Sequence, residues 1–242
     1  MPKTLIIDLD ETVLHSWEAP QFIDKISKDV GKLEKLYPYD QISRAYAIQL
    51  VETETKSYIF GMFRPHLYEF LTFAYVYFDN ILIWSAGVAE YVEKVTDLMF
   101  LNAGIQKPRM TWSRLNCRSC GQMGSVIYHK PIALISNDLK LKYYSAPFEI
   151  DPKQTLILDD KVHTFMENKN NGILIPPYSP AKNIHSIINI GPATNNKLFD
   201  EQFKELVDDS DEALLQFKQW LLKPEVLNSK DYTLLDKTDI FK

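Results

Sequence analysis

The amino-acid sequence predicts an α/β fold built on a doubly wound parallel sheet, with a small β-hairpin flap and C-terminal helices. Three observations lead to this prediction. Short apolar runs recur along the chain, segments with helical periodicity separate them, and several runs end in acidic or hydroxyl side chains. Strands that alternate with helices form parallel sheets, because a parallel connection must cross over the sheet. The polar strand ends should therefore lie at one edge of the sheet.

The first third of the chain begins with a strand and continues with a helix and a hairpin. The strand is expected over residues 4–9, a short apolar run that contains Asp8 and is followed by Asp10. Residues 22–36 carry apolar side chains at helical spacing. The runs YAIQLV and YIFGMF then flank the polar stretch ETETKS, as in two strands joined by a hairpin. We interpret residues 40–63 as a flap, which either extends a sheet or contacts substrate.

The middle of the chain has the pattern helix, strand, helix. Pro65 suits the first position of a helix that continues through LYEFLTFAYVYF. NILIWS is a short apolar run that ends at Ser85. Another helix is expected over residues 89–101, before Gly104 and Pro108 interrupt the periodicity. This alternation is what a parallel sheet requires.

Two further strands and a helical region complete the predicted fold. TLILDD ends in Asp159 and Asp160, and GILIPPY is a strand that two prolines cut off. Beyond residue 192, Leu, Phe and Trp recur at helical intervals in an acidic segment, which predicts one or two closing helices. We therefore expect a main domain that carries the site over residues 1–192 and a helical extension over residues 193–242.

Composition narrows the classes of function. The chain has 242 residues, 45% of them hydrophobic, and a formal net charge of -5. Direct nucleic-acid binding is not expected, because such binding depends on neutralising phosphates with Lys and Arg. The longest apolar runs fall far short of the roughly 20 residues that span a bilayer, and no signal peptide is visible, so no membrane association is expected. We expect an intracellular location, nuclear or cytoplasmic.

The two cysteines, Cys117 and Cys120, exclude a disulfide framework and favour a reducing compartment. Their spacing is also that of a zinc knuckle or a redox pair. Structural zinc needs four ligands, however, and only histidines such as His129 could complete the set. A buried, inert pair of thiols is the favoured interpretation.

The polar ends of three predicted strands form the candidate site. Asp8 and Asp10 belong to the first strand end, Ser85 to the second, and Asp159 and Asp160 to the third. In an open α/β sheet, ligands bind beyond the carboxyl ends of the strands, so these side chains should meet. Carboxylates with a hydroxyl between them suit Mg²⁺ and a phosphate ester as substrate. Taken singly, an acid after a strand also occurs in solvated turns, and Ser85 could serve as a cap.

The order of these motifs resembles a known superfamily. DLDET, then Ser85 after an apolar strand, then LILDD is similar to the haloacid dehalogenase superfamily of aspartate-nucleophile phosphatases. More narrowly, DLDETVLHS, RPHLYEFL, SAGVAEYVEKVTDLM and LILDD resemble the NLI interacting factor-like branch, which acts on the C-terminal domain of RNA polymerase II and related phosphoproteins. The similarity spans residues 3 to about 177.

The resemblance implies a role for each motif residue. Asp8 would attack phosphorus to form an aspartyl-phosphate, and Asp10 would act first as general acid and then as general base. Thr12 and Ser85 would hydrogen-bond the site and the phosphoryl oxygens. Mg²⁺ is the implied cofactor. Its implied ligands are Asp8, the backbone carbonyl of Asp10, Asp159 and Asp160.

The resemblance also implies a lysine that neutralises the phosphoryl oxygens and an arginine that binds phosphate. Lys130 in YHKP matches the tyrosine and lysine of the family pattern, although Pro131 stands where the family has an acid. Lys140 and Lys142 are therefore kept as alternatives. Arg114, three residues before a cysteine, matches the arginine.

The expected substrate is a phosphoserine or phosphothreonine in a protein, because the sequence shows no large cap domain between the first two strands. Trp17 and Tyr178 could bind a proline-containing peptide or pack in the core. The resemblance implies a phosphorylated protein segment as partner, with the RNA polymerase II C-terminal domain as a candidate. One alternative is a phosphatase for nucleic-acid ends or small phosphomonoesters. Another is a catalytically degenerate scaffold, which the intact Asp8, Asp10 and Asp159 disfavour.

Overall fold

The protein is represented by a computed structural model, and the chain forms two compact units. The first unit comprises Met1–Val13, His66–Pro177 and Glu212–Lys242, and the second comprises Leu14–Pro65 and Tyr178–Asp211. The expected helix over residues 22–36, the boundary between residues 192 and 193, and the apolar positions 198–206 lie outside the described residues. The structure describes residues 2–18, 44–51, 57–121, 126–137, 149–180 and 210–242.

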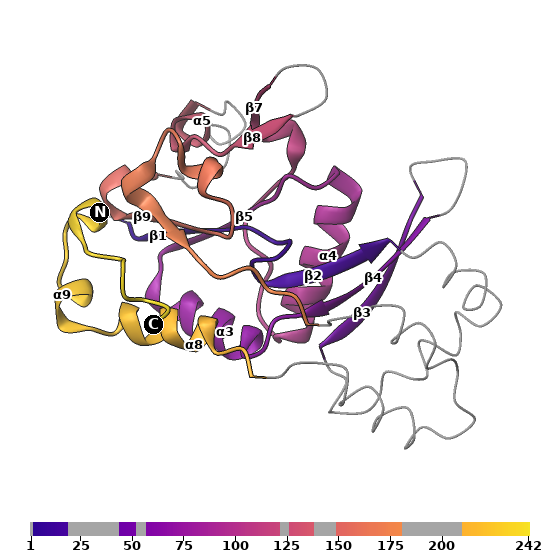
Figure 1. Cartoon of the computed structure of the whole chain (residues 1–242), viewed down its shortest axis with the longest axis horizontal. Coiled ribbons are helices and arrows are strands. Elements are labelled where there is room, and N and C mark those ends of the chain that lie inside the picture. The colour runs from indigo at the N-terminus through magenta and orange to yellow at the C-terminus, as the bar shows by residue number, and fades with distance from the viewer. Residues whose placement is uncertain (1, 19–43, 52–56, 122–125, 138–148, 181–209) are drawn as a thin grey trace. The chain divides into compact units, whose positions relative to one another are not determined.

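A five-stranded parallel sheet organises the first unit (Figure 1). β1 is central, because Ile7 pairs with Ile83 on one side and with Leu158 on the other. All four strand pairings of this sheet are parallel, which confirms the predicted α/β fold. In the order β10-β9-β1-β5-β6, the strands are β10 (Gly172–Leu174), β9 (Thr155–Asp159), β1 (Thr4–Ile7), β5 (Asn80–Trp84) and β6 (Met110–Trp112).

Both faces of this sheet are buried, as expected for parallel strands. Successive residues of a strand point to opposite faces, so Ile6 and Ile7 face different sides, and both have no exposed surface. Ile6 packs in a cluster with Ile132 and Ile135 of α5, while α3 packs on β5 and on α8. Among its described residues, the α-helices of this unit are α3 (Leu67–Tyr77), α4 (Ala89–Asn102), α5 (Ile132–Asn137), α8 (Ala213–Leu221) and α9 (Pro224–Leu227). Its 3-10 helices are η1 (Arg114–Asn116), η3 (Pro152–Gln154), η4 (Val162–Phe165), η5 (Lys169–Asn171) and η6 (Tyr232–Leu234). None of the helices in the described residues is long and apolar enough to cross a bilayer.

Some boundaries and short elements differ from the prediction. The helix expected to start at Pro65 begins at Leu67, because His66 takes a φ of 62°, which lies outside the right-handed helical region. β6 and the antiparallel pair β7 (Arg118–Cys120) and β8 (Ile127–His129) were not predicted. Each has only three residues, too few to show a period of two.

The second unit contains an antiparallel sheet in the order β2-β4-β3. β3 (Ala45–Leu50) and β4 (Ser57–Phe63) form the hairpin that the sequence predicts, and β2 (Leu14–Glu18) adds an unpredicted strand to it. The Tyr46 ring lies across Gly61, where an added Cβ would approach it to 2.3 Å. The Tyr46 hydroxyl is then 2.7 Å from Ser16 Oγ of β2, so one aromatic residue links all three strands.

A buried ion pair ties the two chain segments of the second unit together. Arg64 has no exposed surface, and its Nε and Nη2 donate to the carboxylate of Asp211 at 2.8 and 2.7 Å. The guanidinium also lies 5.5 Å from the centre of the Tyr178 ring. Tyr178 is only 2% exposed, so it packs in the interior and does not offer a surface platform for a peptide.

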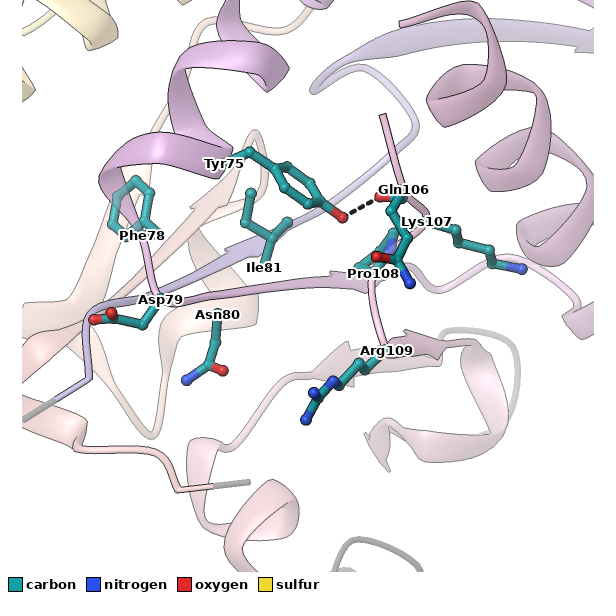
Figure 2. A pocket seen from close by; sticks show the side chains of 9 residues that line it. All are labelled: Tyr75, Phe78, Asp79, Asn80, Ile81, Gln106, Lys107, Pro108 and Arg109. Atoms are coloured by element: carbon teal, nitrogen blue, oxygen red, sulfur yellow. Dashed lines mark hydrogen bonds between the residues drawn. The ribbon is translucent and has the colours of Figure 1, made fainter. Parts of the chain in front are cut away.

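A cavity of about 300 Å³ lies at the amino end of β5 (Figure 2). Tyr75 and Phe78 come from the end of α3, and Pro108 and Arg109 precede β6. The Tyr75 hydroxyl donates to the carbonyl of Gln106. Because the ligand site of a parallel sheet lies at the carboxyl ends of its strands, this cavity is at the opposite edge from the predicted site.

Candidate active site

Asp8 and Asp10 lie in a tight turn directly after β1. The N–H of Thr12 donates back to the carbonyl of Leu9 at 3.1 Å, which closes the turn. Glu11 takes a φ of 58°, in the left-handed region. This conformation costs free energy for a residue with a side chain and is found preferentially at functional sites. The turn holds the two aspartates at the carboxyl edge of the sheet.

Lys130 joins Asp8 to Asp159 across β1 and β9. Its Nζ donates to Oδ1 of Asp8 at 2.5 Å and to Oδ2 of Asp159 at 2.6 Å. The Lys130 side chain is 1% exposed. Its backbone is held on both sides, because its N–H donates to the Thr164 carbonyl and its own carbonyl accepts from Asn168 Nδ2. The cation therefore occupies a fixed position beside the two carboxylates.

The structure thus brings the first of the three candidate lysines to the predicted site. Pro131 does not displace it, because this proline stands directly before α5, where a missing N–H leaves no helical hydrogen bond unmade. Lys140 and Lys142 lie outside the described residues.

Burial controls the charge of this group. Loss of contact with water raises the pKa of Asp8 well above its usual value; Lys130 opposes this rise, and Asp159 adds to it. Burial alone would lower the pKa of Lys130, but the Asp159 and Asp8 carboxylates outweigh burial and raise it. Lys130 is therefore a cation at neutral pH.

Asp8, Asp159 and Asp160 have the arrangement of a metal-binding group. One carboxylate oxygen from each lies within 4.8 Å of the others. Five carboxylate residues line the cavity at this edge of the sheet, against three cationic side chains, so negative charge is in excess there. Hard oxygen ligands in such a site fit a divalent cation such as Mg²⁺. The carboxylate of Asp10 is not part of the group, and the role of its backbone carbonyl stays a prediction.

Thr12 connects the two sides of the carboxylate group. Its hydroxyl donates to Oδ2 of Asp8 at 3.2 Å and accepts from the backbone N–H of Asp160 at 3.1 Å. The Thr12 side chain is buried. It therefore positions the carboxylates of two separate strands relative to each other.

Ser85 and Arg114 lie on the β5 side of the same cavity, whose volume is about 320 Å³. The Ser85 side chain is buried, and its Oγ accepts from the N–H of Gly87 at 2.9 Å. Ser85 is not the cap of α4, because the N-cap of that helix is Val88 and makes no side-chain cap hydrogen bond. Arg114 Nε donates to the Ala86 carbonyl at 2.8 Å, and its guanidinium lies 5.7 Å from the centre of the Tyr128 ring. These contacts hold the Arg114 guanidinium at the mouth of the cavity.

Trp17, the other predicted substrate-binding residue, belongs to the second unit. It lies on β2, half-buried, with its ring 4.7 Å from that of His15. Its part in peptide binding stays a prediction.

Sequence reasoning missed two polar contacts of the predicted residues. Tyr91 of α4 donates from its hydroxyl to Oδ1 of Asp10 at 2.5 Å. Lys161 forms ion pairs with Asp160 and with Glu11. Lys161 directly follows LILDD, so its position next to the motif could have indicated that it contacts the site. No sequence feature indicated this for Tyr91, because it occupies an ordinary core position of an amphipathic helix.

The surroundings of the two cysteines differ from the buried, inert pair that the sequence predicts. Cys117 is half-buried and accepts from Trp84 Nε1 at 3.2 Å, and burial raises the pKa of its thiol. Cys120, however, is exposed, with its sulfur 2.8 Å from His129 Nε2, so the prediction of a buried pair is wrong for this residue. Within the described ranges, Cys117, Cys120 and His129 form no group with the spacing of a metal site.

Comparison with known proteins gives a family match over most of the chain. The family model described as NLI interacting factor-like phosphatase matches residues 3–205. A ubiquitin-like domain-containing CTD phosphatase of Arabidopsis thaliana is 34% identical over 122 residues, which are 50% of this chain and 34% of the relative. A probable C-terminal domain small phosphatase of Dictyostelium discoideum is 24% identical over 209 residues, 86% of this chain and 55% of the relative. The chain thus spans about a third of the first relative and about half of the second.

A solved structure has a similar fold. The structure of Fcp1, described as an essential RNA polymerase II CTD phosphatase, superimposes with a TM-score of 0.52 at 22% sequence identity. The match covers 98% of this chain and 58% of the other. At this identity the likeness concerns the fold, and it agrees with the parallel sheet described above.

Proposed function

Because the chain belongs to the NLI interacting factor-like phosphatase family, we propose that it is a magnesium-dependent phosphatase for phosphoserine or phosphothreonine in proteins. The observation that carries the proposal is the contact of Lys130 with both Asp8 and Asp159, beside a carboxylate group suited to a metal. A buried carboxylate held by a buried cation is an arrangement suited to a nucleophile that meets an anionic substrate.

The first step transfers the phosphoryl group to the protein. A carboxylate oxygen of Asp8 forms a bond to phosphorus while the bond from phosphorus to the serine or threonine oxygen breaks. Asp10 gives its proton to that leaving oxygen, which departs as a neutral hydroxyl. Lys130 and the guanidinium of Arg114 neutralise the phosphoryl oxygens as their charge spreads in the transition state.

The second step regenerates the enzyme. Asp10, now a carboxylate, removes a proton from water, and the resulting oxygen attacks the phosphorus of the aspartyl-phosphate. The bond between phosphorus and the Asp8 oxygen breaks, so inorganic phosphate leaves and both aspartates return to their starting protonation states. A positioned acid and base of this kind typically contributes about 10²- to 10⁴-fold in rate.

Asp8, Asp159 and Asp160, with the backbone carbonyl of Asp10, are the residues proposed to hold Mg²⁺. When bound, the ion supplies positive charge that favours ionised Asp8 and offsets its repulsion of the phosphate. Thr12 and Lys161 would keep two of these carboxylates in place, through the hydrogen bond to Asp8 and the ion pair with Asp160.

The relatives' descriptions support a phosphorylated protein segment as substrate, with the RNA polymerase II C-terminal domain as the first candidate. Arg114 at the mouth of the cavity would bind the phosphate. We expect activity on a phosphoserine peptide to exceed activity on 5′-phosphorylated DNA and on glucose 6-phosphate, compared by kcat/KM. Equal values for the three substrates would contradict the proposed substrate class.

Asp8→Asn tests the nucleophile directly. The substitution keeps the shape of the side chain but removes the attacking anion, so hydrolysis of p-nitrophenyl phosphate should fall by at least about 10³-fold. The matched control is Asp79→Asn, an exposed aspartate at the opposite edge of the sheet, which should leave the rate unchanged. Equal activity in wild type and Asp8→Asn would exclude Asp8 as nucleophile.

A further inference from the structure

The Asp10 carboxyl is held by a side chain from the neighbouring helix. The Tyr91 hydroxyl donates to Oδ1 of Asp10 at 2.5 Å, and the Tyr91 side chain is only 4% exposed. Tyr91 lies in the first turn of α4, the helix that follows the Ser85 strand end. The contact therefore joins the turn after β1 to the helix after β5.

The chain between Ser85 and α4 is shaped to admit this ring. A Cβ added to Gly87 would lie 2.8 Å from Cδ1 of Tyr91 and 3.2 Å from Oγ of Ser85. Both contacts are shorter than side chains normally make with a Cβ, so only glycine leaves the ring and the serine in their observed places. The position of Tyr91 is thus determined by backbone packing on one side and by the carboxyl of Asp10 on the other.

We propose that Tyr91 is a positioning residue that holds the side chain of Asp10 in place for its role at the leaving group, an inference that rests on the proposed function. A phenol hydroxyl that donates to Oδ1 makes this oxygen the acceptor of the carboxyl group. The hydrogen bond therefore fixes the orientation of the Asp10 carboxyl, which also lines the cavity of about 320 Å³. Tyr91 keeps its own proton throughout and does not touch the reacting atoms.

The proposed role of Tyr91 predicts a different effect on substrates that need an acid and on substrates that do not. An aryl phosphate with a strongly electron-withdrawing ring releases a stable phenolate, whereas phenyl phosphate needs a proton on its leaving oxygen. Loss of the Tyr91 hydroxyl should therefore have little effect on the first kind of substrate and a large effect on the second. A residue that only packs in the core would affect both equally.

The test is Tyr91→Phe in the full chain with Mg²⁺, assayed on phenyl phosphates that differ in their ring substituents. We expect kcat/KM for p-nitrophenyl phosphate to change less than about threefold and kcat/KM for phenyl phosphate to fall about tenfold or more, a fraction of the range of general acid catalysis. The dependence of the rate on the leaving group should thus become steeper. This steepness compares substrates within one variant, so a partly inactive preparation does not alter it.

Tyr75→Phe is the matched control, because it removes another tyrosine hydroxyl that donates a hydrogen bond, in the cavity of Figure 2 at the far edge of the sheet. Its leaving-group dependence should equal that of wild type. An active wild type with the same dependence in Tyr91→Phe would overturn the inference and leave the proposed function intact. A wild type that hydrolyses no phosphate ester would overturn the proposed function, and this inference with it.

Discussion

Lys130 is a cation with almost no contact with solvent, held by two carboxylates of different strands. Such a charge is costly to bury, and it is retained only where its partners compensate for the lost hydration. Within the site it balances the first negative charge, and the remaining carboxylates leave room for a divalent cation. In the proposed mechanism, Lys130 and a divalent cation would therefore neutralise different negative charges.

Lys130→Met should therefore abolish most of the activity. We expect kcat/KM for p-nitrophenyl phosphate to fall by at least about 100-fold, because one charge-stabilising donor is typically worth about 10²- to 10³-fold. Lys153→Met is the control: this lysine is 68% exposed and pairs with Asp231 outside the site, so its loss should leave the rate unchanged. A larger loss in Lys153→Met than in Lys130→Met would contradict the assignment.

The positions of the site's carboxylates could be predicted from the sequence, but not all of the residues that contact them. Asp8, Ser85 and Asp159 could be predicted to converge because each lies at the carboxyl end of a recognisable strand. Lys130 comes from the short β8 region, where no periodicity fixes its position, so only the family pattern suggested it. Tyr91 could not be predicted, because a hydrogen bond across two elements depends on the side-chain path past Gly87.

The long elements follow their sequence patterns closely. The run NILIWS gives β5 (Asn80–Trp84), and the helix expected over residues 89–101 is α4 (Ala89–Asn102). Gly104, with a φ of 67°, follows the end of α4 at the position where glycine commonly terminates a helix. The unpredicted β2 has the sequence LHSWE, whose polar and apolar residues do not alternate clearly, and pairing with β4 makes it a strand.

α8 shows how a helix near the end of the sequence stabilises the first unit. Phe217 has no exposed surface, and its ring lies 5.6 Å from that of Phe70 in α3. Phe217→Ala should lower the free energy of unfolding by about 3 to 5 kcal/mol, since it leaves a cavity in the core. The measurement is urea unfolding followed by circular dichroism.

Lys218 on the same helix provides the comparison. Its Nζ donates to Glu69 of α3 at 2.7 Å on the surface, and Lys218→Ala should change the free energy of unfolding by less than about 1 kcal/mol. If both substitutions had the same effect, the contribution of α8 would not come from its buried face.

For the whole molecule, the carboxylate group predicts that Mg²⁺ stabilises the folded state. At a concentration about 100 times its dissociation constant, a ligand bound only by the folded protein adds about 2.7 kcal/mol. The Tm of the transition that unfolds the first unit should then rise by roughly 5 to 10 °C. Scanning calorimetry with Mg²⁺ and with EDTA measures this shift without reference to activity.

Asp160→Asn should lose most of the Mg²⁺-dependent rise in Tm, because it removes one of the three carboxylates. Asp79→Asn should retain the full rise. An unchanged rise in Asp160→Asn would place the stabilising ion elsewhere in the protein.

Because β1 is the central strand, the proposed site can form only late in synthesis. Thr4 pairs with Asn80 and with Thr155, so β1 waits for partners made about 75 and 150 residues later. At about 5 to 20 residues per second, the wait lasts several seconds or more. During synthesis Asp8 therefore lacks Asp159, Asp160 and Lys130, and an unfinished chain cannot assemble the proposed site.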